Sequence, residues 1–548
     1  MGTTARFSRS EEAARRFHEL TTVLYREDGS EIPRKDPLLL SGFKELDPDN
    51  EPDPFKRFLG AAEIALPTDF PETSVRAVDL LSGSVECIPT PFSLESLARL
   101  LFFSAGVTRV FTPKSGGRSR YLRACASAGA LHPIELYVVS DDRPGLAAGV
   151  YHFTPLPFSL EELRLGDFRS FLASAIDDEA ALEASAFLIL TGIPFRTAWK
   201  YTERGYRHVF WDAGTMLANT LAMVDASGWK ASVRLAFSDS HVTALLGLQD
   251  QFEVPLVVVA IRAPASDRAE RAETAIPPLA MSTTPVAPRP VVFPLVIETQ
   301  AAGDLDQSDV GSWREAAAKV GSPATTRTIA APEQTSNEII ESLILRRGST
   351  RMMRRQTVPL EVLRWVMSIA TRPIPGDFAA SEATLLNYHL AVYDVEATES
   401  GFYEWSGGEL RMSRAEDSAT VRAETQPLIA FWGDDAAYSL YECADLDELL
   451  PALGARGYRA AQVEAGIVAG RVNLAAFSLG YGSTPLTVRD RFVADVFGKK
   501  ANFMLTMVVG TPGYSNVSGG KPGKPVELSG LEGLIDRLID HIRKSRDP

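Results

Sequence analysis

The chain contains a long-range internal repeat. A segment that begins at Arg204, RGYRHVFWDAGTMLANTLAMVDASG, aligns without gaps with one that begins at Arg456, RGYRAAQVEAGIVAGRVNLAAFSLG. Both contain Arg-Gly-Tyr-Arg, an Ala-Gly pair and a closing glycine, and the apolar residues after the Ala-Gly pair have helical spacing. A duplicated domain usually keeps the two-fold interface of a homodimeric parent. We therefore expect two copies of one fold that pack as an intramolecular pseudo-dimer.

Neighbouring segments extend the repeat over most of the chain. ELYVVSDD and GVYHFTP in the first half match HLAVYDVE and SGFYEWSG in the second, a pattern of strand, turn and strand. Upstream, FSLESLARLLFFSAGVTR and VPLEVLRWVMSIATRP are each typical of an amphipathic helix. The predicted fold class is therefore α+β. The predicted limits are an N-terminal extension over residues 1–75, domains over 76–262 and 336–548, and a Pro- and Ala-rich connection over 263–335.

Composition excludes several classes of protein. At 548 residues the chain is too long for one ordinary domain, and its 45% hydrophobic and 23% charged residues are typical of globular proteins. The net charge of −14 argues against nucleic-acid and membrane partners. The cysteines, Cys87, Cys125 and Cys443, form no CxxC pattern, which predicts neither disulfides nor a metal site. Because the N-terminus also lacks an apolar export segment, we expect a cytoplasmic protein.

The first segment suited to binding is RRGSTRMMRR in the second half. Arg347 and Arg351 flank the hydroxyl of Ser349, which suits a phosphate or another planar anion because each guanidinium offers paired donors in a fixed fork. The alternative is a solvated basic end of the helix NEIIESLIL, favoured by the helix dipole.

Two further segments lie in the first half. In RACASAGALHP, small residues allow a ligand to approach the backbone, and Ser127 offers a donor and an acceptor. A tight loop that enters a strand is the alternative there. In WKYTERGYR, Lys200 beside Tyr201 offers two exchangeable protons with pKa values that burial shifts easily, as general acid–base catalysis requires. A structural pair is the alternative for this segment.

The repeat also contains arginines that both halves keep. We interpret them as scaffold residues that form ion pairs, and not as catalysts. They are Arg204, Arg207, Arg456 and Arg459.

Taken in order, these segments resemble the nitroreductase-like flavoproteins, in particular the SagB-type dehydrogenases, or azoline oxidases, of thiazole/oxazole-modified peptide biosynthesis. The resemblance depends on SAGALHPIELYVV, GVYHFTP and WKYTERGYR in the first half. It also depends on RRGSTR, which is similar to the FMN-binding Arg-x-Ser-x-Arg/Lys string of nitroreductases. It implies a sandwich of a mixed sheet and helices, with FMN bound at the interface between the two copies.

The resemblance also implies a set of site residues. Lys200 and Tyr201 are the implied catalytic pair. Arg347, Ser349 and Arg351 would hold the phosphate and the pyrimidine edge of FMN, with Lys524 or Lys521 as a further phosphate ligand. The other implied contacts with the flavin are Tyr481, Gly482 and Ser483 from the second half, and Ser127, Ala128, Gly129 and Leu131 from the first.

The two copies have lost opposite parts of this pattern. Where the second half has RGSTR, the first has LLSGSVECIPT, without an arginine. Where the first half has Ser-Ala-Gly and Lys-Tyr, the second has AASEATLLNYH and Ala452-Leu453. One complete interface, and hence a single FMN per chain, is predicted.

The sequence departs from the family at two positions of the Ser-Ala-Gly loop. Ala126 stands where the family usually has Pro, and His132 where it usually has Tyr. His132 is either an added proton relay or a packed imidazole.

The resemblance implies an FMN-dependent enzyme that dehydrogenates thiazoline or oxazoline rings to the azoles in a ribosomally made peptide or a carrier-bound precursor. FMN would accept a hydride while Lys200 removes the neighbouring proton with help from Tyr201, and dioxygen would reoxidise the flavin. A cyclodehydratase is an implied partner. Two alternatives stay open: an NAD(P)H-dependent reductase of nitro compounds or quinones, and a non-catalytic scaffold subunit of a peptide-modifying complex.

Overall fold

The computed structural model describes residues 8–22, 46–113, 118–249, 251–264, 267–270, 276–333, 335–429, 433–486 and 490–528. The predicted N-terminal extension and second domain therefore include stretches outside the described residues, namely 1–7, 23–45 and 529–548. Within the described ranges, no helix is both long enough and apolar enough to cross a membrane.

Each half of the chain builds one antiparallel sheet of seven strands, ordered β1-β6-β5-β4-β7-β9-β8 in the first half and β11-β18-β16-β13-β14-β15 in the second, where β17 also pairs with β18. The first sheet contains β1 (Ala62–Ala65), β4 (Ile134–Ser140), β5 (Gly149–Pro155), β6 (Phe158–Leu165), β7 (Ala186–Gly192), β8 (Lys230–Arg234) and β9 (Val254–Arg262). The second contains β11 (Met353–Arg354), β13 (Asn387–Val392), β14 (Gly401–Ser406), β15 (Glu409–Ala415), β16 (Tyr438–Ala444), β17 (Gly482–Leu486) and β18 (Asn502–Pro512).

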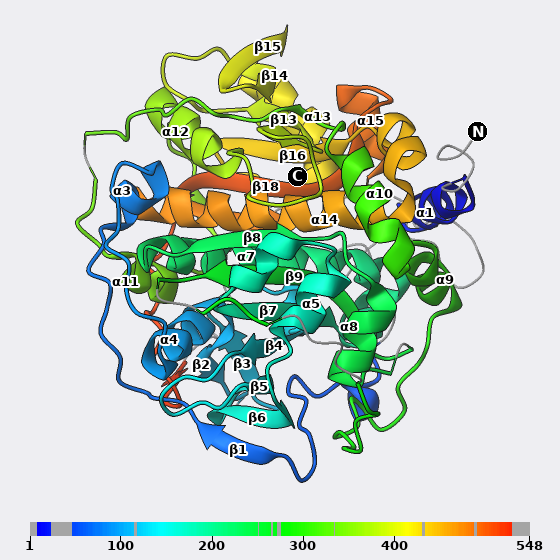
Figure 1. Ribbon diagram of the computed structural model, residues 1–548. Coiled ribbons are helices and arrows are strands. Elements are labelled where there is room, and N and C mark those ends of the chain that lie inside the picture. The colour runs from blue at the N-terminus through cyan, green and yellow to red at the C-terminus, as the bar shows by residue number, and fades with distance from the viewer. Residues whose placement is uncertain are drawn as a thin grey trace.

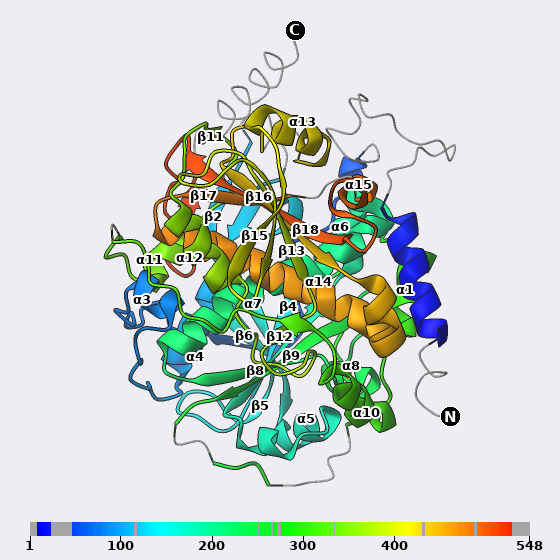
Figure 2. The ribbon, with the colours of Figure 1, turned by 90° about the horizontal axis from the view of Figure 1, so that it is seen from above.

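Helices cover the sheets, as Figures 1 and 2 show. In the first half and the extension they are α1 (Ser8–Leu20), α3 (Ala77–Ser82), α4 (Leu94–Ala105), α5 (Arg169–Ala175), α6 (Pro194–Tyr201), α7 (Gly205–Ala226) and α8 (Asp239–Leu246). In the connection and the second half they are α9 (Pro294–Ala302), α10 (Gln307–Ala317), α11 (Ile340–Arg346), α12 (Leu360–Ala370), α13 (Ser418–Ile429), α14 (Leu446–Ser478) and α15 (Arg491–Phe497).

The continuous apolar runs of the central strands follow from burial on both faces. In β7, Leu188 and Leu190 enter the large core that includes α7, whereas Phe187 and Ile189 enter a second core beside α5 and α8. A strand covered on both faces has no polar positions to alternate with its apolar ones. The apolar run VVVAI lies in β9, which pairs with β7.

The two halves meet where the repeated helices α7 and α14 lie side by side between the two sheets (Figure 1). They approach most closely at the repeated glycines, because a Cβ on Gly214 would lie 2.5 Å from the Cα of Gly466 and 2.4 Å from the carbonyl oxygen of Val463. Next to this contact, Trp211 Nε1 donates a hydrogen bond of 2.5 Å to Gln462 Oε1. The chain is therefore an intramolecular pseudo-dimer, as the repeat predicts.

Reciprocal buried ion pairs join the halves on either side of this contact. Arg204 and Arg207 of the first half bind Asp490 of the second, at 2.7 and 2.5 Å. In the opposite direction, Arg456 Nη1 lies 2.9 Å from Asp239 Oδ1, and Arg459 Nη1 lies 3.6 Å from the same oxygen. An isologous interface has this property, since each patch contacts its own copy on the partner. The four repeated arginines thus form ion pairs, as the sequence predicts.

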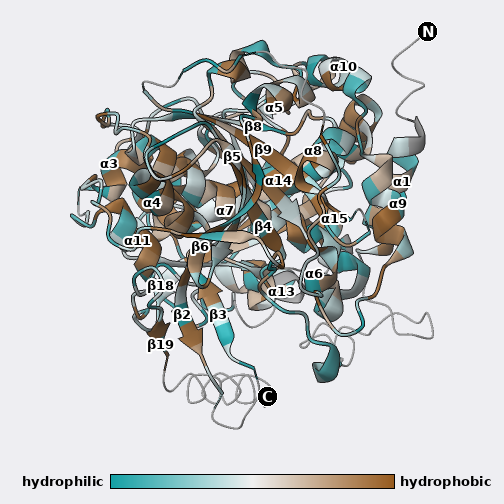
Figure 3. Cartoon of the chain, turned by 60° about the horizontal axis from the view of Figure 1, so that its bottom comes forward, coloured by the Kyte–Doolittle hydropathy of each residue, from teal (hydrophilic) through white to brown (hydrophobic). Residues whose placement is uncertain are grey.

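Segments outside the two sheets also tie the halves together. Helix α1 of the extension runs beside one end of α14 (Figure 2), and Trp313 on α10 in the connection is fully buried and donates a 3.0 Å hydrogen bond to the carbonyl of Leu453. The tail of the second half returns to the first, where β19 (Val526–Glu527) pairs in parallel with β2 (Val107–Phe111). Figure 3 shows this small sheet, which β3 (Arg120–Arg123) completes.

Replacing Asp490 with Asn should destabilise the protein by about 3–5 kcal/mol, because it leaves two buried guanidiniums without their counter-charge. The matched control is Glu409→Gln in the exposed Glu409–Arg411 pair, which should leave the stability nearly unchanged because solvent screens the pair. Denaturant unfolding followed by tryptophan fluorescence measures both changes. Equal stability of the two variants would contradict the role assigned to the inter-half pairs.

Candidate active site

The predicted binding segments of the two halves meet at one end of the interface. Arg347, which follows α11, is buried and its Nη2 donates a 2.6 Å hydrogen bond to the carbonyl of Ala124, three residues before Ser127. Arg347 of the second half and the Ser127 segment of the first are therefore neighbours in the fold, although they are far apart in the sequence.

A second arginine, absent from the sequence-based prediction, lies against Arg347. Arg109 on β2 donates from Nε to Val517 O at 2.7 Å and from Nη2 to the carbonyls of Leu345 and Arg347. Burial lowers the pKa of both guanidiniums, that of Arg109 to about 10 with a further contribution from Arg347. Neither forms an ion pair with a carboxylate in the described part of the chain, and Arg347 Nε has no hydrogen-bond partner there. Two buried like charges bonded only to carbonyls favour an anion nearby.

Lys200 and Tyr201 lie beside the Ser-Ala-Gly loop. The Nζ of Lys200 is 5.5 Å from the centre of the Tyr201 ring, and a Cβ on Gly129 would lie 3.0 Å from Tyr201 Oη. Burial lowers the pKa of Lys200, and the charges of Arg120 and Arg351 lower it further. Burial also raises the pKa of Tyr201, so its phenol is neutral at ordinary pH. The first-half pair and the second-half Arg351 thus act on each other through space.

Arg351 combines an exposed side chain with a lowered pKa. Its side chain is open to solvent, yet desolvation by the surrounding protein lowers its pKa. The backbone around it is fixed by Tyr514, whose Oη accepts from Arg351 N at 3.0 Å and donates to Ser349 O at 3.1 Å. Ser349 itself is half-buried.

The predicted glycine and serine of β17 also lie against RGSTR. Thr350 N donates to Ser483 O at 3.0 Å, and a Cβ on Gly482 would lie 2.4 Å from Thr350 Oγ1. The hydroxyl of Ser483 is buried and donates to Asn473 Oδ1 at 2.6 Å, while Asn473 Nδ2 has no partner among the described residues. Tyr481 is half-buried.

The tail of the second half contains the two lysines predicted to bind the phosphate. Lys521 and Lys524 are exposed, and Lys524 N donates to Lys521 O at 2.9 Å in a tight turn. In the described residues, no hydrogen bond joins either ammonium group to the RGSTR segment.

The Ser-Ala-Gly loop is held by a carboxylate that sequence reasoning missed. Ser127 Oγ donates to Asp212 Oδ2 at 2.5 Å, and Ala128 N donates to Asp212 Oδ1 at 3.0 Å. Leu131 is buried behind the loop. Asp212 lies on α7 inside the repeat, where the equivalent residue is Glu464, and this shared acid is the signal that could have identified it.

His132 is a packed imidazole in the structure. Its Nε2 lies 2.6 Å from the carbonyl of Tyr121, and its backbone N–H donates to Ser127 Oγ at 2.9 Å. Burial, with the charge of Arg123, lowers the pKa of His132 to about 3. A neutral ring that bonds to a backbone carbonyl favours the packing alternative over the proton relay.

The N-terminal extension forms a wall beside these residues, which no sequence pattern indicates. Arg123 Nη2 donates to Pro54 O, and Arg196 Nε donates to Asp53 O, both at 2.8 Å. Trp199 Nε1, next to Lys200, donates to Asp47 O at 2.9 Å. Residues 47–54 therefore fix the helix that carries Lys200 and Tyr201.

The repeat relates the interface with Arg347 and Ser127 to a second one, which is arranged differently. There Glu464 accepts from Thr384 Oγ1 at 2.6 Å and from Leu385 N at 2.9 Å. Strand β8 is bonded to the second half, because Val233 N donates to Pro375 O at 2.7 Å. The loop contact is kept at this interface, whereas no arginine stands in the place of Arg347.

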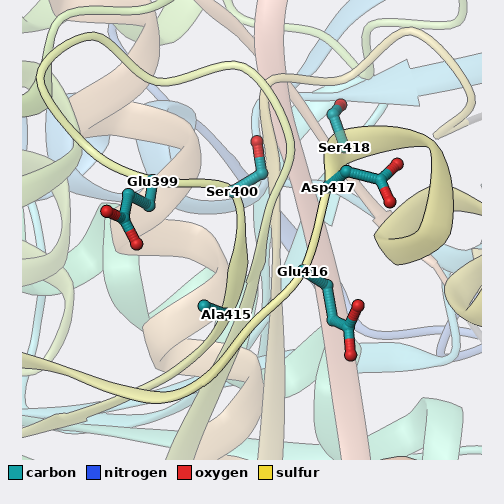
Figure 4. Close-up of a pocket in the computed structure, with 6 residues that line it drawn as sticks. All are labelled: Glu399, Ser400, Ala415, Glu416, Asp417 and Ser418. Carbon is teal, nitrogen blue, oxygen red and sulfur yellow. The ribbon is translucent and has the colours of Figure 1, made fainter.

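A hollow elsewhere on the surface contains none of the predicted residues (Figure 4). It is lined by Glu399, Ser400, Ala415, Glu416, Asp417 and Ser418. Asp417 accepts from the backbone N–H groups of Ala419 and Thr420 and so caps the start of α13. Its acidic lining is unsuited to an anion, and in the described residues no cluster of His, Cys, Asp and Glu could hold a metal ion.

Comparisons with known proteins agree with this architecture. A putative nitroreductase from Anabaena variabilis ATCC 29413 has a solved structure that superposes on 91% of this chain and 99% of its own, with a TM-score of 0.69 at 24% identity, and so shares the fold. The chain is 30% identical over 185 residues to the microcin B17-processing protein McbC of Escherichia coli, and 28% identical over 172 residues to the trifolitoxin-processing protein TfxB of Rhizobium leguminosarum bv. trifolii. These matches cover 33% and 30% of this chain, and 65% and 46% of the two relatives, less than two thirds of either.

The family match covers both halves. Residues 89–261 and 344–511, which together make up more than half of the chain, each match the nitroreductase family. These stretches include the two repeated helices and most of the residues placed at the interface. The chain belongs to the nitroreductase family, with two nitroreductase domains in tandem.

Proposed function

We propose that the protein is an FMN-dependent dehydrogenase that oxidises thiazoline or oxazoline rings in a peptide or a carrier-bound precursor. One observation carries the proposal: Lys200 and Tyr201 of the first half lie beside the Gly129 loop and within electrostatic reach of Arg351 of the second half. We propose that this proton-accepting pair and this anion-binding string share one cleft.

The residues present fit FMN. The phosphate needs cations that no carboxylate already neutralises. Arg347 and Arg109 are buried and bonded only to carbonyls, and Arg347 Nε has no hydrogen-bond partner among the described residues. Gly129 and Gly482 lack a side chain where Tyr201 and Thr350 approach their backbone, and so allow the predicted residues to pack closely. Asn473 Nδ2 is a further buried donor without a partner in the described chain.

Arg347, Ser349 and Arg351 would hold the phosphate and the pyrimidine edge, with Lys524 or Lys521 reaching the phosphate from the tail. The ring would lie between two groups of residues, Tyr481, Gly482 and Ser483 on one side and Ser127, Ala128, Gly129 and Leu131 on the other. Bound FMN supplies a two-electron acceptor.

The chain's own residues then handle the proton. Lys200 would take a proton from the ring carbon next to the oxidised position, and its lowered pKa makes the neutral form easier to reach. Tyr201 stays protonated and donates a hydrogen bond to the substrate or relays the proton. The positive charge of Arg351 stabilises negative charge that develops in the cleft.

The names of McbC and TfxB, which denote the processing of microcin B17 and trifolitoxin, support a peptide substrate. We propose a cyclodehydratase as the partner that supplies the azoline, and dioxygen as the final electron acceptor. We also propose a cytoplasmic location, which the unpaired state of Cys87, Cys125 and Cys443 supports.

The family also supports a second candidate, an NAD(P)H-dependent reductase of nitro compounds or quinones that uses the same cleft. Anaerobic mixing separates the two: bleaching of the flavin by an azoline peptide supports the dehydrogenase, and bleaching by NAD(P)H alone supports the reductase. Colourless protein that FMN cannot reconstitute would instead favour a non-catalytic scaffold subunit.

Titration with FMN should give a single bound flavin per chain. Arg347→Ala should weaken binding by about 30-fold or more, since loss of a buried charge pairing costs about 2–5 kcal/mol. Arg372→Ala is the matched control, because Arg372 Nη1 lies 3.2 Å from the position of a Cβ on Gly83, inside the first-half counterpart of RGSTR. Flavin fluorescence measures both, and equal losses in the two variants, or two flavins per chain, would refute the single-site proposal.

Lys200→Ala should lower the rate of azoline oxidation by about 10²–10⁴-fold while the protein stays yellow, because a general base contributes that much. Lys500→Ala, at an exposed lysine, is the control and should leave the rate unchanged. A yellow Lys200→Ala variant that oxidises an azoline peptide at the parental rate would exclude the assigned role.

The rate should rise with pH as Lys200 loses its proton, since only the neutral amine accepts one. Arg120→Met removes a positive charge that lowers the Lys200 pKa, so the rising limb should move to higher pH. Steady-state rates from pH 6 to 10 measure the shift. A limb that stays in place, or moves to lower pH, would show that another group titrates.

A further inference from the structure

Each of the two central helices carries a buried acid that holds a loop of its own half in the same way. Asp212 on α7 accepts from the hydroxyl of Ser127 and the N–H of Ala128, at 2.5 and 3.0 Å. Glu464 on α14 accepts from the hydroxyl of Thr384 and the N–H of Leu385, at 2.6 and 2.9 Å. The contact is thus older than the divergence of the halves, but only the Asp212 loop borders Lys200 and Tyr201.

Asp212 is enclosed by groups from three elements. Arg123 on β3, Cys125 in the loop and Tyr201 on α6 are the titratable groups that interact with it, and within the described residues it forms no ion pair. Burial raises its pKa to about 7, although the bonds from Ser127 and Ala128 and the charge of Arg123 oppose this rise. The acid can therefore change its charge near neutral pH.

The loop that Asp212 holds is strained. Ala130 and His132 have φ of +54° and +48°, values that residues with a side chain rarely adopt. Contacts with α7 keep the loop in this shape, since Thr215 Oγ1 donates to Ala126 O at 2.7 Å in addition to the Asp212 bonds. Loss of an Asp212 bond should therefore loosen the segment that faces Tyr201.

We propose that Asp212 is a positioning residue that fixes the Ser-Ala-Gly loop and sets the direction in which the Ser127 hydroxyl donates. When the carboxylate is ionised, it accepts the Ser127 proton and directs it away from the cleft. When Asp212 takes up a proton from solvent, its O–H donates to Ser127 Oγ, which already accepts from His132 N. The Ser127 proton is then free to donate into the cleft.

Amide hydrogen exchange tests this proposal without any flavin. In the parent, protection of residues 124–134, corrected for the intrinsic rate, should be about fivefold higher at pH 8 than at pH 6, because hydrogen bonds from Ser127 and Ala128 to an ionised carboxylate are stronger than those to the neutral acid. Asp212→Asn resembles the protonated acid and should show the lower protection at both pH values. Ser127→Ala removes the partner and should also abolish the pH dependence.

Glu464→Gln is the matched control, since it changes the equivalent contact in the other half. It should lower protection in residues 380–390 and leave residues 124–134 as in the parent. Retention of the parental pH dependence by Asp212→Asn, or equal loosening of both loops in both variants, would overturn the proposal.

The effect on the cofactor depends on the proposed function and is read separately. The FMN dissociation constant should vary more steeply with pH between 6 and 8 in the parent and in Glu464→Gln than in Asp212→Asn, where the second ionisation of the FMN phosphate remains but that of Asp212 is absent. An equal pH dependence in the parent and in Asp212→Asn would overturn the proposal. Failure of the parent to bind FMN would refute the proposed function, while hydrogen exchange would still decide the role of Asp212.

Discussion

The close crossing of α7 and α14 is the contact on which the rest of the structure depends. Gly214 and Gly466 lack side chains at the point where the helices touch, and any Cβ there would collide with backbone. The reciprocal pairs of Asp490 with Arg204 and of Asp239 with Arg456 then fix the rotation of one half against the other. Since the proposed site takes residues from both halves, the distance between them is set by this interface and not by either domain alone.

Duplication within one chain explains why the two interfaces differ. In a homodimer each substitution appears at both equivalent sites, whereas in a tandem chain each copy of a residue can change independently. One interface joins Arg347 to the Ser127 loop, and the other joins β8 to the backbone at Pro375. Both keep the acid that holds the loop, because that contact supports the fold whether or not a ligand is bound.

The sequence predicts the pseudo-dimer and the α+β class because repeated motifs and apolar spacing are local patterns. The scaffold arginines could be identified because both halves keep them, whereas a catalytic residue need not recur in a half that has lost its site. Arg109 and residues 47–54 could not be found, because their importance depends on which carbonyls lie next to them after folding. Asp212 could be found only in part. Its recurrence as Glu464 is visible in the sequence, but an acid in a helix usually faces solvent, so its burial could not be predicted.

The tail of the second half returns to the first half and so helps to keep the two halves together in solution. The β19–β2 pairing, together with the connection through α9 and α10, links the halves at both ends of the second domain. Partners joined in this way meet at an effective concentration that dilution of the protein does not change. The contact between Arg347 and Ala124, which a homodimer would lose at low abundance, is therefore kept in every molecule of this chain, however few copies a cell contains.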